Sequence, residues 1–144
     1  MTMDANFWAN VHGGTTHFPI AMIFVACLCD TAALCFWHKP AAVSLRTAGK
    51  YSAIIAALGS VPAVISGLVM TRGDMLGDDS ALRLHHLFVW PAFTLMVAVA
   101  VWRSLTREQV SRRGYAGYVG VICVLTGLIA ATGYWGGELL KAFP

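Results

Sequence analysis

The sequence predicts an all-α integral membrane protein, a four-transmembrane-helix bundle formed by one domain over residues 1–144, and three observations support this. First, 58% of the 144 residues are hydrophobic and the mean hydropathy is +0.67, whereas about half apolar is usual in a soluble domain. Second, four apolar stretches each approach the roughly 20 residues that a helix needs to cross a bilayer. Third, the basic residues gather in alternate connections between these stretches, as they do in multi-pass membrane proteins.

Local signals set the limits of the predicted helices. The first begins at Phe18, because Pro19 suits the first turn of a helix, and the absence of any earlier Lys or Arg argues against a cleaved signal peptide. The second and fourth are rich in small residues, which let helices in lipid approach closely. The third follows a turn in which Asp79 or Ser80 can serve as the N-cap. The four predicted ranges are 18–37, 51–70, 84–102 and 115–134.

The distribution of basic residues predicts the orientation of the chain. Cytoplasmic loops collect Lys and Arg. Seven basic residues lie in the connections between the first and second helices and between the third and fourth, whereas only three lie at the opposite side. We therefore expect both basic connections on the cytoplasmic side and both termini outside. The seven are Lys39, Arg46, Lys50, Arg103, Arg107, Arg112 and Arg113, and the three are Arg72, Arg83 and Lys141.

Four of the five histidines converge on the outer side in this topology. The stretch ALRLHHLFVW places His85 and His86 at the start of the third helix, and VHGGTTHFPIAM places His12 and His17 at the approach to the first. Adjacent helical residues point about 100° apart, so we expect one of His85 and His86 to face inward without deciding which. The end of the fourth helix brings Tyr134, Trp135, Gly136, Gly137 and Glu138 to the same level.

Haem b is one ligand that suits this cluster. It requires two axial imidazoles from facing helices, an apolar slot, and small residues where the macrocycle presses on backbone. His17 with His86, or with His85, are the predicted ligands of the haem iron. The basic side chains of Arg83 and Arg72 are candidates to pair with the propionates.

Two other ligands remain open, beside a purely structural role. A quinone would accept hydrogen bonds from a histidine and Tyr134 while stacking on Trp135. A bare Zn²⁺ or copper ion would take imidazoles and Glu138 as ligands. Histidines at a membrane boundary also simply bond neighbouring carbonyls, and the spacing of 13–14 residues between paired histidines that typifies membrane di-haem cytochromes is absent.

Asp30 is a second candidate, placed roughly 20 Å deeper than His17 in the first predicted helix. An intramembrane carboxylate is by default a proton relay or an ion ligand. The alternative is a structural contact, with Lys50, Arg113, Thr31 or Tyr51 as the expected partner.

Four segments together resemble a known group of sequences: HFPIAMIFVACLCD, the RG turn after the second helix, the HH start of the third, and GYWGGEL at the end of the fourth. They resemble a family of bacterial membrane proteins known as domain-of-unknown-function family 2231. The resemblance implies four membrane helices in an electron-transfer setting, beside periplasmic cytochromes c and quinoprotein sugar or sorbosone dehydrogenases. With the orientation predicted above, it implies a multi-pass protein of the bacterial inner membrane whose termini are both periplasmic. The polar positions that match are His17, Asp30, His86, Gly136 and Gly137, whereas His12 is followed by Gly13 where the family usually has a His-Pro pair.

The function we predict is a small membrane subunit of a respiratory or dehydrogenase-type electron-transfer complex, binding haem b, quinone or both near the periplasmic face. The chain has no nucleotide motif or nucleophile triad, so we expect no complete reaction from it alone. Its expected partners are the lipid bilayer and redox subunits such as a cytochrome c or a dehydrogenase, and no nucleic acid. The alternatives are a non-catalytic membrane anchor and a small ion or metal carrier.

Overall fold

The computed structural model describes residues 2–76, 80–106 and 110–141, which form four helices. Each helix is long and apolar enough to cross a membrane. The part of the chain that is described contains no strand, so the predicted all-α fold is confirmed. The helices are α1 (Thr2–Cys35), α2 (Ala41–Met70), α3 (Ser80–Leu105) and α4 (Arg112–Lys141).

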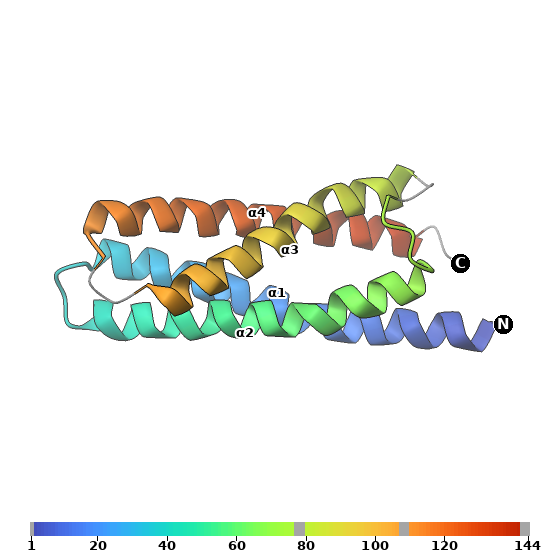
Figure 1. Cartoon of the computed structure of the whole chain (residues 1–144), viewed down its shortest axis with the longest axis horizontal. Helices are drawn as coiled ribbons and strands as arrows, with labels where there is room; N and C mark the ends of the chain where they lie inside the picture. The colour runs from blue at the N-terminus through green and yellow to red at the C-terminus, as the bar shows by residue number, and fades with distance from the viewer. Residues whose placement is uncertain (1, 77–79, 107–109, 142–144) are drawn as a thin grey trace.

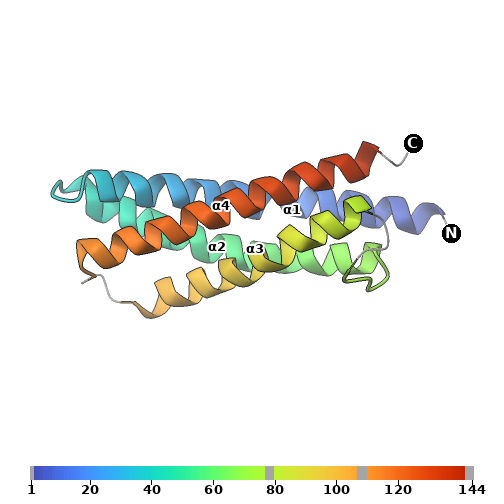
Figure 2. The ribbon, with the colours of Figure 1, turned by 90° about the horizontal axis from the view of Figure 1, so that it is seen from above.

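The helices are arranged as an elongated antiparallel bundle (Figure 1). Contacts between described residues join α1 to α2, α2 to α3, α3 to α4 and α4 to α1, so α1 and α3 are diagonal to one another. The start of α1 and the end of α4 lie at one end of the bundle with the α2–α3 connection, which we call the terminal end (Figures 1 and 2). The α1–α2 and α3–α4 connections lie at the other end, which we call the basic end.

The predicted start of the first helix at residue 18 is wrong by sixteen residues, because α1 begins at Thr2. Pro19 therefore lies inside the helix and is buried. The hydroxyls of Thr15 and Thr16 bond carbonyls of the preceding turn, which supports the helix ahead of the proline. Hydropathy locates the apolar part of a helix, whereas the helix itself continues wherever the backbone can bond and pack.

The first helix ends at Cys35, two residues before its predicted limit, and the second ends at Met70 as predicted, whereas the remaining predicted limits fall short for the same reason. The second helix begins at Ala41 rather than 51, and its added turns include Arg46 and Lys50, whose charges lower the hydropathy without opposing a helix. The third extends to 80–105 and the fourth to 112–141. Ser80 begins α3, whereas Asp79, the other predicted N-cap, lies outside the described residues.

Small residues form the contact between α1 and α2. Every buried residue of α2 is Ala, Gly or Ser, so the backbone of α1 approaches closely, as packing in lipid favours. The buried residues of α1 repeat at intervals of three and four, which keeps them on one face of the helix. They are Pro19, Ile23, Ala26, Asp30 and Ala33, so Asp30 occupies a core position.

Candidate functional site

Polar side chains form two layers inside the bundle, one towards each end. On α1, His12 and Asp30 are 18 residues apart, and on the diagonal helix α3 the same spacing separates His85 from Arg103. Eighteen residues complete five helical turns, so each pair shares a face of its helix with a separation of about 27 Å. This is close to the thickness of a hydrocarbon core, about 30 Å.

His12 begins the histidine layer at the terminal end. Its Nδ1 lies 2.9 Å from the carbonyl oxygen of Ala63 and 3.2 Å from the hydroxyl of Ser66, both on α2. The ring packs against Gly67, where a β-carbon would lie 3.0 Å from its Cε1 atom. The absence of a side chain at Gly67 thus gives the imidazole its place.

His85 repeats this arrangement across the bundle. Its Nδ1 lies 3.0 Å from the carbonyl oxygen of Thr132 on α4. A β-carbon at Gly136 would lie 3.4 Å from the Cε1 and Nδ1 atoms of the ring. In both helix pairs, α1 with α2 and α3 with α4, the accepting carbonyl belongs to the residue four positions before the glycine, so the two histidines have matching surroundings.

The hydrogen bonds fix the tautomer of both rings. A carbonyl oxygen can only accept, so Nδ1 of His12 and of His85 must carry the proton. In the neutral imidazole Nε2 then keeps its lone pair, which is the second-shell arrangement of many metal-ligating histidines. The geometry therefore offers two ligand nitrogens from diagonal helices.

His86 also faces the interior. The sequence predicted that only one of His85 and His86 would do so. Its side chain is 8% exposed, and its Nδ1 is buried without a hydrogen-bond partner among the described residues. The ring lies 5.8 Å from that of His85 and 6.2 Å from that of Trp90, between centroids. The indole of Trp90 bonds the Met75 carbonyl at 3.0 Å, which ties the α2–α3 connection to α3. Nδ1 of His86 is therefore a buried polar atom whose hydrogen-bonding capacity the described residues leave unused.

The remaining predicted site residues are spread over the terminal end. His17 is exposed on the surface of α1, with its Nδ1 bonded to the Gly13 carbonyl of its own helix, so the structure does not bring it into the layer. Tyr134 is 62% exposed and meets Trp135 edge to face. Arg72, Arg83 and Gly137 are exposed, whereas Trp135 and Glu138 are half-buried.

No group of three or more His, Cys, Asp or Glu side chains among the described residues is arranged to hold a metal ion. The described part of the chain therefore contains no three-ligand cluster for the Zn²⁺ or copper ion considered from the sequence. Two imidazoles suffice for an axially ligated haem, whose remaining ligands come from its own macrocycle.

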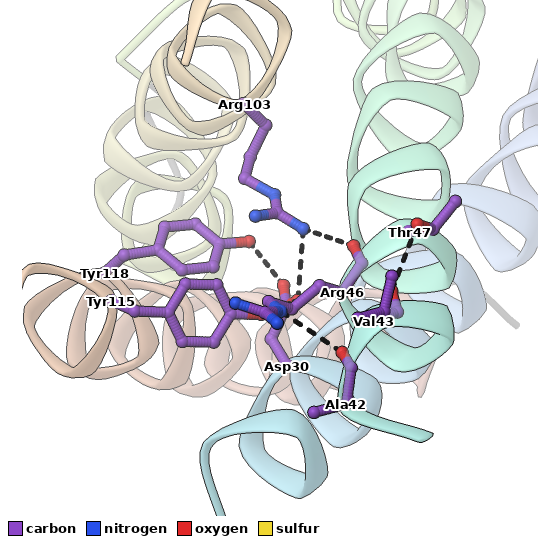
Figure 3. A network of polar contacts seen from close by, with 8 residues as sticks. All are labelled: Asp30, Ala42, Val43, Arg46, Thr47, Arg103, Tyr115 and Tyr118. Atoms are coloured by element: carbon purple, nitrogen blue, oxygen red, sulfur yellow. Dashed lines mark hydrogen bonds and ion pairs between the residues drawn. The ribbon is translucent and has the colours of Figure 1, made fainter. Parts of the chain in front are cut away.

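The second layer, at the basic end, is built around Asp30, whose side chain is fully buried (Figure 3). The hydroxyl of Tyr115 donates to its Oδ1 at 2.6 Å, and that of Tyr118 donates to Oδ2 at the same distance. The guanidinium of Arg103 completes the layer with an ion pair of 3.3 Å to Oδ1. The carboxylate thus joins α1 to both α3 and α4.

Helix α2 contributes backbone to the same layer. Arg103 also donates to the carbonyl of Arg46, while its Nε is buried without a partner among the described residues. A β-carbon at Gly49 would lie 2.5 Å from the carboxyl carbon of Asp30, so only glycine fits here. The guanidinium of Arg46 lies 4.6 Å from the centre of the Trp37 ring, a cation–π contact.

The partners expected for Asp30 are therefore wrong, since its bonds go to Arg103, Tyr115 and Tyr118. One sequence signal points to these residues: the heptad-like spacing that makes Asp30 a core residue also places Arg103 in line with the buried Ala92, Met96 and Val99. Neither the pattern of α1 nor that of α3 shows by itself that the two helices place Asp30 and Arg103 in contact.

Comparison with known proteins identifies a family but supplies no biochemical role. No curated protein and no solved structure matches the chain. A family model described as "Predicted membrane protein (DUF2231)" matches residues 9–143. This range includes both polar layers, the whole of α2, α3 and α4, and α1 from residue 9 onward. The chain therefore belongs to the DUF2231 family of predicted membrane proteins.

Proposed function

We propose that this protein is a membrane-embedded electron-transfer subunit that binds haem b in the histidine layer, with His12 and His85 as the axial ligands. The observation that carries the proposal is the matched pair of Nδ1–carbonyl bonds, which leaves two Nε2 lone pairs on diagonal helices. His12 replaces His17, which the sequence predicted as a ligand of the haem iron, because His17 lies on the exposed side of α1.

The residues of the layer fit such a group. Bis-imidazole ligation needs neutral, oriented rings from facing helices, and each ring here is held by a carbonyl and seated on a glycine, Gly67 or Gly136. When bound, the haem would supply one-electron chemistry whose potential is set by its ligands and by burial. The chain itself orients the two imidazoles and surrounds them with apolar helix.

The proposed orientation puts the histidine layer at the periplasmic side of a bacterial inner membrane. Both basic connections lie at the opposite end, and Lys and Arg favour the cytoplasmic side. A cytochrome c or a periplasmic dehydrogenase is the partner that would meet the site from water. The bilayer would supply the quinone pool from the side.

A quinone bound in the same layer is the second candidate, supported by His86. Its buried and unpartnered Nδ1 suits a carbonyl of a quinone ring, and Trp90 offers an aromatic neighbour. The rival class is the non-catalytic anchor, in which both layers only hold the helices together. An ion carrier is less favoured, because the carboxylate of Asp30 already accepts from three side chains.

The test is a reduced-minus-oxidised spectrum and a pyridine haemochrome assay on the full chain, purified from a haem-producing host. We expect a b-type band that His12→Ala and His85→Ala each remove. His17→Ala is the matched control, since it removes an exposed imidazole of the same helix, and should leave the band unchanged.

Three outcomes would contradict the proposal. A folded chain without haem would favour the quinone or anchor alternatives. A band that survives both His12→Ala and His85→Ala would exclude this ligand pair. If the band is lost in His17→Ala or His86→Ala but remains in His12→Ala, the ligands are the pair predicted from the sequence, His17 and His86.

A further inference from the structure

Two thiols from different helices are in contact inside the predicted membrane-spanning part of the bundle. The sulfur of Cys27 on α1 lies 3.7 Å from the sulfur of Cys123 on α4, although the residues are 96 positions apart in the chain. Cys27 is half-buried and Cys123 is exposed on the surface of the bundle. The pair belongs to neither polar layer and has no part in the proposed haem site.

The other two cysteines of the chain make no such contact. Cys29 is also on α1, about 200° around the helix from Cys27, and Cys35 ends the helix. All four are free thiols. Helix packing alone therefore selects one pair out of the four, and the remaining two serve as internal controls.

We propose that Cys27 and Cys123 form an oxidisable pair, a modification site at which a disulfide ties α1 to α4. Two S–H bonds break and one S–S bond forms, and two electrons and two protons pass to molecular oxygen, which becomes hydrogen peroxide. The sulfurs need to approach from 3.7 Å to about 2.05 Å. Oxygen is small and apolar, so it reaches a thiol that faces the bilayer.

The disulfide would link two helices whose contact with one another is limited. The contact of α1 with α4 is the least extensive of the four helix contacts, whereas that with α2 is the most extensive. A covalent link between residues so far apart removes freedom mainly from the unfolded chain, and the gain grows with the length of the closed loop. Oxidation should therefore raise the unfolding temperature, and a reductant should reverse the rise.

The experiment uses two matched double variants of the full chain in detergent or liposomes. C29S/C35S keeps the contacting pair, and C27S/C123S keeps the other two thiols. Both are reduced, then exposed to oxygen with copper phenanthroline as catalyst. Free thiols are counted by maleimide labelling and mass spectrometry, and the cross-link is located by peptide mapping without reduction.

We expect C29S/C35S to lose both thiols within one chain and to unfold at a higher temperature than its reduced form, while C27S/C123S forms no intramolecular link. Free thiols in oxidised C29S/C35S would overturn the proposal. So would a link that forms only between two chains, or equal cross-linking in both variants. Helical circular dichroism of the reduced samples verifies that each variant is folded.

Discussion

Asp30 and Arg103 form a 3.3 Å ion pair between α1 and α3, the two helices that are diagonal in the bundle. Each residue follows a histidine of the other polar layer by 18 positions, so the ion pair and the histidine pair are two levels of one arrangement. The Asp30 and Arg103 side chains are 0% and 10% exposed, which makes their contact a buried one. Losing one partner of such a pair leaves an uncompensated charge.

We therefore predict that Asp30→Asn destabilises the chain by about 3–5 kcal/mol, the usual cost of breaking a buried ion pair. The Arg103 guanidinium would remain buried without its counter-charge. Chemical unfolding in detergent, followed by circular dichroism, measures the change. The double variant Asp30→Asn/Arg103→Gln should cost less than the sum of the single changes, and strict additivity would show that the two charges are not coupled.

Tyr115→Phe and Tyr118→Phe should each lower the unfolding free energy by about 1.5–3 kcal/mol, because each removes a hydrogen bond to a charged group. Tyr134→Phe, the same change on the same helix at a 62% exposed side chain, is the control and should be close to neutral. If all three variants unfold alike, the tyrosines do not act through Asp30.

Gly49→Ala should destabilise the bundle by about 1–3 kcal/mol, in the range of overpacked core changes. The new methyl group would overlap the Asp30 carboxylate and push α2 away from α1. Gly120→Ala is the matched control, because no atom lies within 4 Å of the added β-carbon and alanine favours a helix. A neutral result for Gly49→Ala would mean that the Asp30 side chain is free to move aside.

The orientation of the bundle can be tested with single cysteines in a cysteine-free chain. Ser111→Cys reports on the basic end and Met75→Cys on the terminal end, both at exposed positions. A membrane-impermeant maleimide added to intact cells should label Met75→Cys, because the basic end is expected to face the cytoplasm. Labelling of Ser111→Cys instead would reverse the orientation and move the proposed haem site to the cytoplasmic side.

The composition and the four apolar stretches determined the fold class, because crossing a bilayer demands long helices whose backbone bonds are satisfied internally. The same stretches misplaced the helix limits. Residues 2–17 and 41–50 are helical through packing and backbone bonding, to which hydropathy is insensitive. The prediction placed His12 on the approach to the first helix, whereas it is a residue of α1 whose side chain bonds α2.

What the sequence determined by itself was which polar residues needed an explanation: a buried carboxylate and histidines at one level. Only the tertiary structure decided their partners, since His85 and His86 both face the interior and Asp30 meets Arg103 and two tyrosines. The physical reason is that periodicity gives the face on which a residue lies on its own helix. The rotation and depth of each helix against its neighbours come from the packing of the small residues of α2, which a single helix does not encode.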